Sequence, residues 1–128
     1  MTKQVIVMRK DLNMRKGKMI AQGAHASVMV CVDIQSQWCP DYGFSEVQGG
    51  PEFDEWMGSG MTKICVGVDS EADLIDIYEK AKRSGIACAL VQDAGHTEFA
   101  GVPTYTCCAV GPDTDEKVDE ITGSLKLL

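Results

Sequence analysis

Four short apolar runs, separated by segments with helical spacing, organise most of the chain. The runs lie at residues 5–8, 64–68, 87–91 and 105–110. Nearly continuous apolar runs of this length are typical of strands that are buried on both faces of a sheet. A helix is expected over residues 16–32, where small residues would let it pack closely against such a sheet.

Capping signals mark two further helices. Ser70 is followed three residues later by Asp73, a pattern that favours a helix start. The core face of this helix repeats at i, i+3, i+4 and i+7 and consists of Leu74, Ile77, Tyr78 and Ala81. Gly85 suits the position just after its last turn. A last helix is expected to open at Gly111-Pro112-Asp113, with Asp113 as its N-cap.

The order of these elements predicts the fold class. Strands that alternate with helices favour a mostly parallel sheet with helices on both faces. The third and fourth apolar runs have no helix between them, so one strand is expected to run antiparallel. Residues 33–60 are rich in turn residues and are interpreted as a long ordered crossover with a short helix at residues 52–57. We therefore expect an α/β fold, a three-layer α/β/α sandwich with a four-stranded mixed, mostly parallel sheet, in a single domain over residues 1–128.

Composition narrows the class of protein. A chain of 128 residues with 45% hydrophobic content is long enough for one domain with a core and too short for two. No apolar run approaches the roughly 18 residues that a membrane span needs. The first apolar run is followed at once by Arg9 and Lys10, which does not fit a signal peptide. The sequence is therefore interpreted as a mature cytoplasmic protein.

The six cysteines fit reduced thiols better than a disulfide framework. Four of them lie in predicted strands and no secretory signal is recognised, so they are expected to be core residues. No Cys-x-x-Cys occurs, and neither histidine has zinc-ligand spacing to a cysteine pair. No metal or cofactor is expected. A small metal site built from His25, Cys31 and Cys39 stays open as an alternative.

Charge is distributed unevenly along the chain. The net charge of −7 argues against generic nucleic-acid binding. Residues 1–18 nevertheless contain six cations and one anion, for a net charge of +5, whereas the rest contains six cations and eighteen anions, for −12. The basic segment is either a solvated loop or a local phosphate-binding surface, and the charge distribution alone does not distinguish between these two interpretations.

A polar stripe on the first predicted helix is the first candidate for chemistry. Helical spacing aligns Lys18, Gln22, His25 and Met29 on one side, which either faces water or lines a cleft. The complementary stripe, expected to face the core, consists of Ile20, Ala24, Ser27 and Cys31. A lysine at a helix start opposes the macrodipole, and an anionic ligand would offset that cost. The structural alternatives are a solvated Lys18 and a His25 that hydrogen-bonds a backbone carbonyl.

The second candidate is the turn after the third predicted strand. Asp93 lies at a strand end, where open α/β sheets usually bind ligands. It could pair with Lys18 and so remain ionised. Thr97 could act as nucleophile, water ligand or oxyanion donor, and the sequence leaves all three open. The alternative is an ordinary turn in which Asp93 caps local amides. Brought together, the two segments would supply most of what ester hydrolysis on an anionic substrate requires.

Several segments, taken together and in order, resemble the type 2 peptidyl-tRNA hydrolase family. They are Arg9-x-Asp11-Leu12-x-Met14-x-Lys16-Gly17-Lys18-x-x-Ala21-Gln22-x-x-His25-Ala26, Tyr78-Glu79-Lys80-Ala81-Lys82, Asp93-Ala94-Gly95-x-Thr97-Glu98, Gly111-Pro112 and Ile121-Thr122-Gly123-x-Leu125-Lys126-Leu127-Leu128. The resemblance spans nearly the whole chain. It implies a small α/β fold, usually dimeric, that hydrolyses the ester between a peptide and the 3′ end of tRNA without a metal.

The resemblance also implies site residues. The functional positions of the family fall on Lys18, Gln22, His25, Asp93 and Thr97, the same residues as the stripe and the turn. Contacts to tRNA are expected from Arg9, Lys10, Arg15, Lys16 and His96. The family usually has arginine where this chain has His96, and a neutral imidazole cannot clamp a phosphate as an arginine can. A family member that binds tRNA or a protein without turnover is the alternative function.

Overall fold

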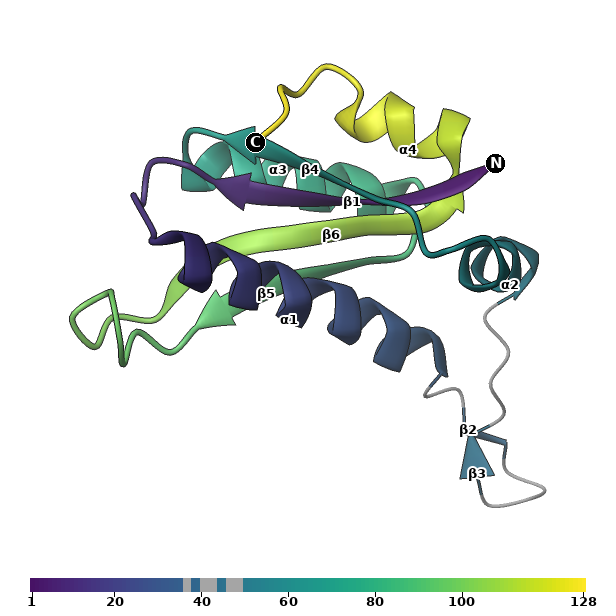
Figure 1. Cartoon of the computed structure of the whole chain (residues 1–128), viewed down its shortest axis with the longest axis horizontal. Helices are drawn as coiled ribbons and strands as arrows, with labels where there is room; N and C mark the ends of the chain where they lie inside the picture. Colours follow the sequence, from purple (N-terminus) through teal and green to yellow (C-terminus); the bar gives the residue numbers. More distant parts are fainter. Residues whose placement is uncertain (36–37, 40–43, 46–49) are drawn as a thin grey trace.

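The computed structural model describes residues 1–35, 38–39, 44–45 and 50–128 (Figure 1). Its elements, in chain order, are β1 (Thr2–Arg9), α1 (Lys16–Gln35), β2 (Trp38–Cys39), β3 (Phe44–Ser45), α2 (Gly50–Gly58), β4 (Lys63–Val68), α3 (Glu71–Arg83), β5 (Cys88–Asp93), β6 (Thr104–Thr114) and α4 (Asp115–Thr122). The expectation of a long ordered crossover over residues 33–60 lies partly outside the described residues. None of the helices described here combines the length and apolar character that crossing a bilayer requires.

The main sheet has four strands in the order β4-β1-β6-β5. β1 pairs with β4 in parallel, and β6 pairs antiparallel with both β1 and β5. Three strands therefore share one direction and β6 alone runs the other way, which confirms the predicted mixed sheet with one antiparallel strand. Because β6 lies between β1 and β5, only one of the three neighbouring pairs is parallel.

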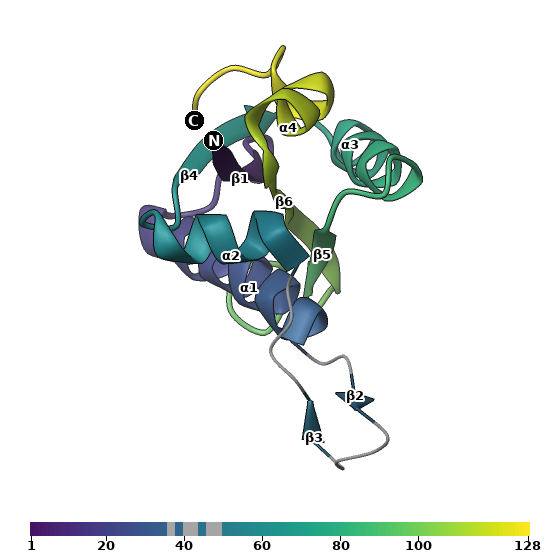
Figure 2. The ribbon, with the colours of Figure 1, turned by 90° about the vertical axis from the view of Figure 1, so that its right-hand side faces the viewer.

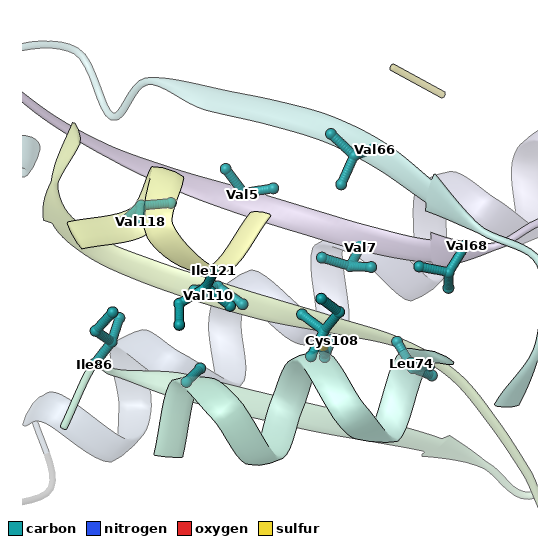
Figure 3. Packing of buried hydrophobic residues seen from close by; sticks show 12 residues of the cluster. Val5, Val7, Val66, Val68, Leu74, Ile86, Cys108, Val110, Val118 and Ile121 are labelled. Atoms are coloured by element: carbon teal, nitrogen blue, oxygen red, sulfur yellow. The ribbon is translucent and has the colours of Figure 1, made fainter. Parts of the chain in front are cut away.

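Helices cover both faces of this sheet, as the three-layer prediction requires (Figure 2). α3 and α4 pack on one face over a core that is rich in valine, and Figure 3 shows ten labelled members: Val5, Val7, Val66, Val68, Leu74, Ile86, Cys108, Val110, Val118 and Ile121. α1 packs on the other face, against Ile6, Met8, Ala89 and Ala109. Successive residues of β1 alternate between these two cores, which explains why its run is apolar throughout.

The helix-capping predictions were right at α3 and wrong at α4. The Ser70 hydroxyl accepts a hydrogen bond from the Asp73 amide at 3.0 Å, and Gly85 has a left-handed φ of +71° just after the helix. The last helix, however, is capped by Thr114 rather than by Asp113. Strand β6 continues to Thr114 because residues 113 and 114 still pair with Lys3 and Thr2 of β1. Backbone pairing with a distant strand thus overrides the local capping signal.

The face that α1 buries differs from the predicted one. Gln22, Ala26, Ser27 and Val30 are buried, whereas Ile20 is 72% exposed. Of the stripe that was expected to face the core, only Ser27 is buried; Cys31 is half-buried and Ala24 is exposed. The helix carries apolar residues on several sides, so its periodicity does not identify the buried side. The side of α1 that packs against the sheet includes the polar Gln22.

Candidate functional site

The candidate residues gather at one edge of the sheet. The three strands that share a direction, β1, β4 and β5, all end at this edge, and α1 begins there (Figure 1). The loop over residues 94–103 starts from the end of β5 at the same place (Figure 1). This is the edge where open α/β sheets usually bind ligands. The fold therefore brings together two segments that are 75 residues apart in sequence.

The Lys18 ammonium is the centre of the site. Its Nζ donates to Asp93 Oδ1 at 2.8 Å and to Thr97 Oγ1 at 2.9 Å, and it lies 5.6 Å from the centroid of the Phe99 ring. The side chains of Lys18 and Asp93 are each only 14% exposed. An ammonium has three N–H donors, so two are used inside the site and one is left for a ligand.

Asp93 is held as a carboxylate with both oxygens engaged. Oδ1 accepts from Lys18 and, at 3.4 Å, from Gln22 Nε2, while Oδ2 accepts from the backbone N–H of Gly95 at 2.9 Å. The Lys18 hydrogen bond, assisted by the Gly95 amide, holds the pKa of Asp93 below its ordinary value although burial opposes this. The turn needs glycine, because Gly95 has φ +86° and an added Cβ would lie 2.4 Å from the Val102 carbonyl oxygen. Asp93 thus both caps its turn and pairs with Lys18.

Gln22 connects this carboxylate to the buried part of β6. Its side chain is 2% exposed, and its Oε1 accepts a 2.5 Å hydrogen bond from the hydroxyl of Thr106, which is fully buried. The thiol of Cys107 also donates to the Gln22 backbone oxygen, at 3.2 Å. Gln22 is therefore fixed by β6 through its side chain and its backbone.

His25 and His96 lie at the open side of the site. His25 is exposed and lines a pocket of about 310 Å³ together with Gln22, Met29, Val91, Gln92, Asp93 and Ala94. His96 is exposed in the turn after Asp93, close enough for its charge to help lower the pKa of Asp93. Both imidazoles can therefore meet a ligand that approaches Asp93.

The basic residues that were predicted to contact tRNA differ in their exposure and in the hydrogen bonds that they already make. Arg15 and Lys16 are exposed beside the start of α1. The Arg9 side chain is 11% exposed, and its guanidinium donates to both Asp11 carboxylate oxygens, at 3.1 and 2.7 Å, and to the Tyr105 backbone oxygen at 3.0 Å. This pairing raises the pKa of Arg9 and lowers that of Asp11. Arg9 thus joins the β1 end to β6 and has little surface left for a ligand.

The cysteines form no disulfide among the described side chains, which include all but Cys39. Cys107 and Cys108 are buried core thiols as predicted, and Cys88 is half-buried. Cys65 is exposed, contrary to the expectation, because β4 is an edge strand whose α1-side face is left open. No three His, Cys, Asp or Glu side chains in the described part of the chain are grouped to hold a metal ion. The alternative metal site included Cys39, whose side chain lies outside the described residues.

Comparison with known proteins assigns the family. The sequence profile described as Peptidyl-tRNA hydrolase PTH2 matches residues 2–128. The peptidyl-tRNA hydrolase of Methanocaldococcus jannaschii is 44% identical over 126 residues, which cover 98% of this chain and 99% of the relative. The peptidyl-tRNA hydrolase of Haloquadratum walsbyi is 45% identical over 125 residues, covering 98% of both chains. The chain belongs to the peptidyl-tRNA hydrolase PTH2 family.

Two contributors to the site of this PTH2 family member were missed by sequence reasoning. Phe99 places its ring beside the Lys18 ammonium, and Thr106 anchors Gln22 from within the core. A signal for Thr106 was present, since it is a polar residue within the otherwise apolar run of residues 105–110. Nothing local marks Phe99, because its contact depends on the path of the loop over residues 94–103.

Proposed function

We propose that this protein hydrolyses the ester that joins a peptide, or an N-blocked aminoacyl group, to the 3′ end of tRNA, and so returns the tRNA for reuse. Membership of a family whose relatives are named peptidyl-tRNA hydrolases supports the reaction. The observation that carries the proposal is the Lys18 ammonium, fixed between Asp93 and Thr97 with one N–H donor still available. An ester carbonyl placed at that donor would meet a cation whose side chain is only 14% exposed.

The chemistry follows from this arrangement. Attack of water on the ester gives a tetrahedral intermediate with a negatively charged oxygen, which Lys18 is placed to stabilise. Asp93 holds the ammonium in position through its hydrogen bond. The Thr97 hydroxyl oxygen accepts a hydrogen bond from an ammonium, which cannot remove a proton from it. This favours Thr97 as a ligand of water or of the oxyanion over Thr97 as nucleophile. His25, exposed at the adjacent pocket, would contact the substrate and the attacking water, while the buried Gln22 would hold Asp93 in place.

The tRNA would lie over the exposed cations at the same edge. Lys16 and Arg15 are exposed next to Lys18, and Lys10 is 44% exposed with its Nζ 3.7 Å from Asp69. His96 adds a phosphate contact when its imidazole is protonated. Arg9 would support this surface by holding the loop, since three of its five N–H donors are engaged within the protein. The local positive charge offsets a chain whose net charge is −7.

A direct assay tests the reaction. Purified protein should release N-blocked amino acid from an N-acetyl-aminoacyl-tRNA and leave the same aminoacyl-tRNA with a free amine largely intact. Parallel binding measurements with deacylated tRNA separate turnover from binding. Binding of tRNA with no ester cleavage would contradict the proposal and would instead support the binding-module alternative. We also propose that the 128 residues act as one domain, and that it works in the cytoplasm, where translation uses its product.

We further propose that the protein is a homodimer that uses an apolar groove beside α1. The groove has a volume of about 510 Å³ and is lined largely by apolar atoms of α1, β1, β4 and the C-terminal residue, including Ile6, Met8, Met19, Ile20, Cys65 and Leu128. On α1, Ile20 is 72% exposed and Val28 is 59% exposed. We call the exposed apolar side of α1 that carries Ile20 and Val28 the apolar ridge. A two-fold axis would let the apolar ridge of each protomer cover the groove of the other.

Placing a charge on this ridge should dissociate the dimer. We expect Ile20→Glu to lower the solution mass from twice that of the chain to that of one chain, because a carboxylate would have to be buried in an apolar interface. Light scattering after size-exclusion chromatography measures this. Val102→Glu is the control, since Val102 is 59% exposed on the loop after β5, away from the groove. An unchanged mass for Ile20→Glu, or a monomeric wild type, would rule the interface out.

A further inference from the structure

The Gln22 carboxamide lies between a carboxylate and a buried hydroxyl. Its Nε2 donates to Asp93 Oδ1 at 3.4 Å and its Oε1 accepts from Thr106 Oγ1 at 2.5 Å. Gln22 is 2% exposed and Thr106 is fully buried. A carboxylate can only accept hydrogen bonds, so the NH₂ group must face Asp93 and the amide oxygen must face β6. Among the residues that the structure describes, the Thr106 hydroxyl is the donor to that oxygen.

We propose that Thr106 is a positioning residue for the hydrolytic reaction, acting through the orientation of Gln22. The inference rests on the proposed function of the same site. Without the hydroxyl, the amide oxygen of Gln22 would be buried with no donor, which is a costly arrangement. The side chain would relieve it by turning toward the open pocket beside His25, and its NH₂ group would then leave Asp93. The contact at 3.4 Å is already long, so a small rotation is enough to break it.

The backbone of α1 is held at the same point. The Cys107 thiol donates to the Gln22 backbone oxygen at 3.2 Å. Burial raises the pKa of the Cys107 thiol to about 12, so the thiol keeps its proton at neutral pH and remains a donor. Two successive residues of β6 thus anchor the side chain and the backbone of Gln22. The freedom left to Gln22 is rotation of its carboxamide, which the Thr106 hydroxyl restricts.

The consequence reaches Lys18 through Asp93. Asp93 Oδ1 accepts from both Gln22 and Lys18, while Oδ2 accepts from the Gly95 amide, so the Gln22 donor helps to set where the carboxylate presents Oδ1 to the ammonium. Loss of that donor leaves the carboxylate anchored through Oδ2 by the Gly95 amide, so that Oδ1 and the ammonium can shift together. Misplacing a group that stabilises the transition state lowers the rate of the chemical step more than it weakens substrate binding.

The chain offers a matched control for removing a buried hydroxyl. Thr122 on α4 is 3% exposed, and its hydroxyl donates to the Val118 backbone oxygen at 3.1 Å, on the opposite face of the sheet. Thr106→Val and Thr122→Val make the same isosteric change in two buried places. Thr106→Ser keeps the hydroxyl and loses only a methyl group. Urea unfolding measures the change in the free energy of unfolding of each variant, separately from the change in kcat.

The experiment is a double-mutant cycle with steady-state kinetics on N-acetyl-aminoacyl-tRNA. Thr106→Val should lower kcat roughly tenfold with KM changed less than twofold. Thr106→Ser, which keeps the hydroxyl, should retain most of the wild-type kcat. In a Gln22→Ala background, Thr106→Val should cause no further loss, because the residue through which it acts is gone. Thr122→Val should keep wild-type kcat. Equal effects of the two Thr→Val changes, or full additivity with Gln22→Ala, would overturn the proposal.

A second readout does not depend on turnover. Carbonyl-detected NMR of the Asp93 side chain should show its titration moving to higher pH in Thr106→Val and Gln22→Ala alike, and staying in place in Thr122→Val. An unmoved Asp93 titration in Thr106→Val would reject the positioning role even in an active enzyme. If the wild type fails to cleave the ester, the proposed function falls, while this measurement still decides whether Thr106 orients Gln22 toward Asp93.

Discussion

Replacing Lys18 with methionine is expected to lower kcat by about 100- to 1000-fold, the usual cost of removing one donor to a developing oxyanion. Methionine keeps most of the length and the apolar stem of lysine and removes the charge. The third N–H donor, which is free of Asp93 and Thr97, disappears with it. KM should change much less, because phosphate contacts are assigned to neighbouring cations rather than to Lys18. Initial rates over a range of substrate concentrations separate the two parameters.

A control with the same change of charge makes this result interpretable. Lys117 on α4 is 59% exposed and lies 3.9 Å from Asp113, outside the candidate site. Lys117→Met should retain wild-type kcat and KM. The thermal unfolding of Lys18→Met also needs to stay cooperative, because Asp93 loses its partner in that variant. A folded Lys18→Met protein with kcat within threefold of wild type would remove Lys18 from the mechanism.

Much of this site was predictable because it follows local rules. The helical repeat put Lys18 and Gln22 on one stripe, and the end of a strand marked Asp93. The 2.8 Å hydrogen bond between Lys18 Nζ and Asp93 Oδ1 depends on the sheet order, which places the end of β5 and the start of α1 at one edge. The alternation of strands and helices indicated an edge of this kind. The resemblance to a known family then named the same residues independently.

What the sequence did not predict depends on non-local packing. The stripe of α1 that was predicted to face the core consists of Ile20, Ala24, Ser27 and Cys31, and only Ser27 is buried. The sheet buries Gln22 instead, because Thr106 and Asp93 form hydrogen bonds with its carboxamide. A polar residue is inexpensive to bury when a partner exists, and that partner is 84 residues away. For the same reason the extension of β6 to Thr114 could not be anticipated, since its pairing partners lie at the other end of the chain.

The two oxygens of Asp93 suggest why this carboxylate, rather than a nearby one, serves the site. Asp11 also has a lowered pKa, but its oxygens are taken up by the Arg9 guanidinium, which is itself tied to β6. Three of the five N–H donors of Arg9 are thereby used within the protein, and its side chain is only 11% exposed. Asp93 instead fixes a lysine that keeps one donor free. Similar ion pairs at the same edge therefore have different consequences.

Asp93→Asn is expected to lower kcat by about 100-fold or more, because a carboxamide cannot hold the ammonium by charge and has only one acceptor oxygen, whereas Lys18 and the Gly95 amide now donate to two. Asp76→Asn is the matched control, since Asp76 pairs with Lys80 on the exposed surface of α3. Near-wild-type turnover in Asp93→Asn would contradict the mechanism.

The wild-type pH dependence follows from the same carboxylate. Because its pKa is lowered in the folded state, the stability that Asp93 contributes is present above the ordinary aspartate pKa and is lost as the pH falls through the lower folded value. Asp93 should therefore stay ionised through mildly acidic pH. Any loss of activity between pH 5 and 7 should come from the titration of other groups. The control variant Asp76→Asn should show the same pH–rate profile as the wild type. An acid limb that is centred above the ordinary aspartate range and abolished only in Asp93→Asn would show that Lys18 does not hold this carboxylate as the structure indicates.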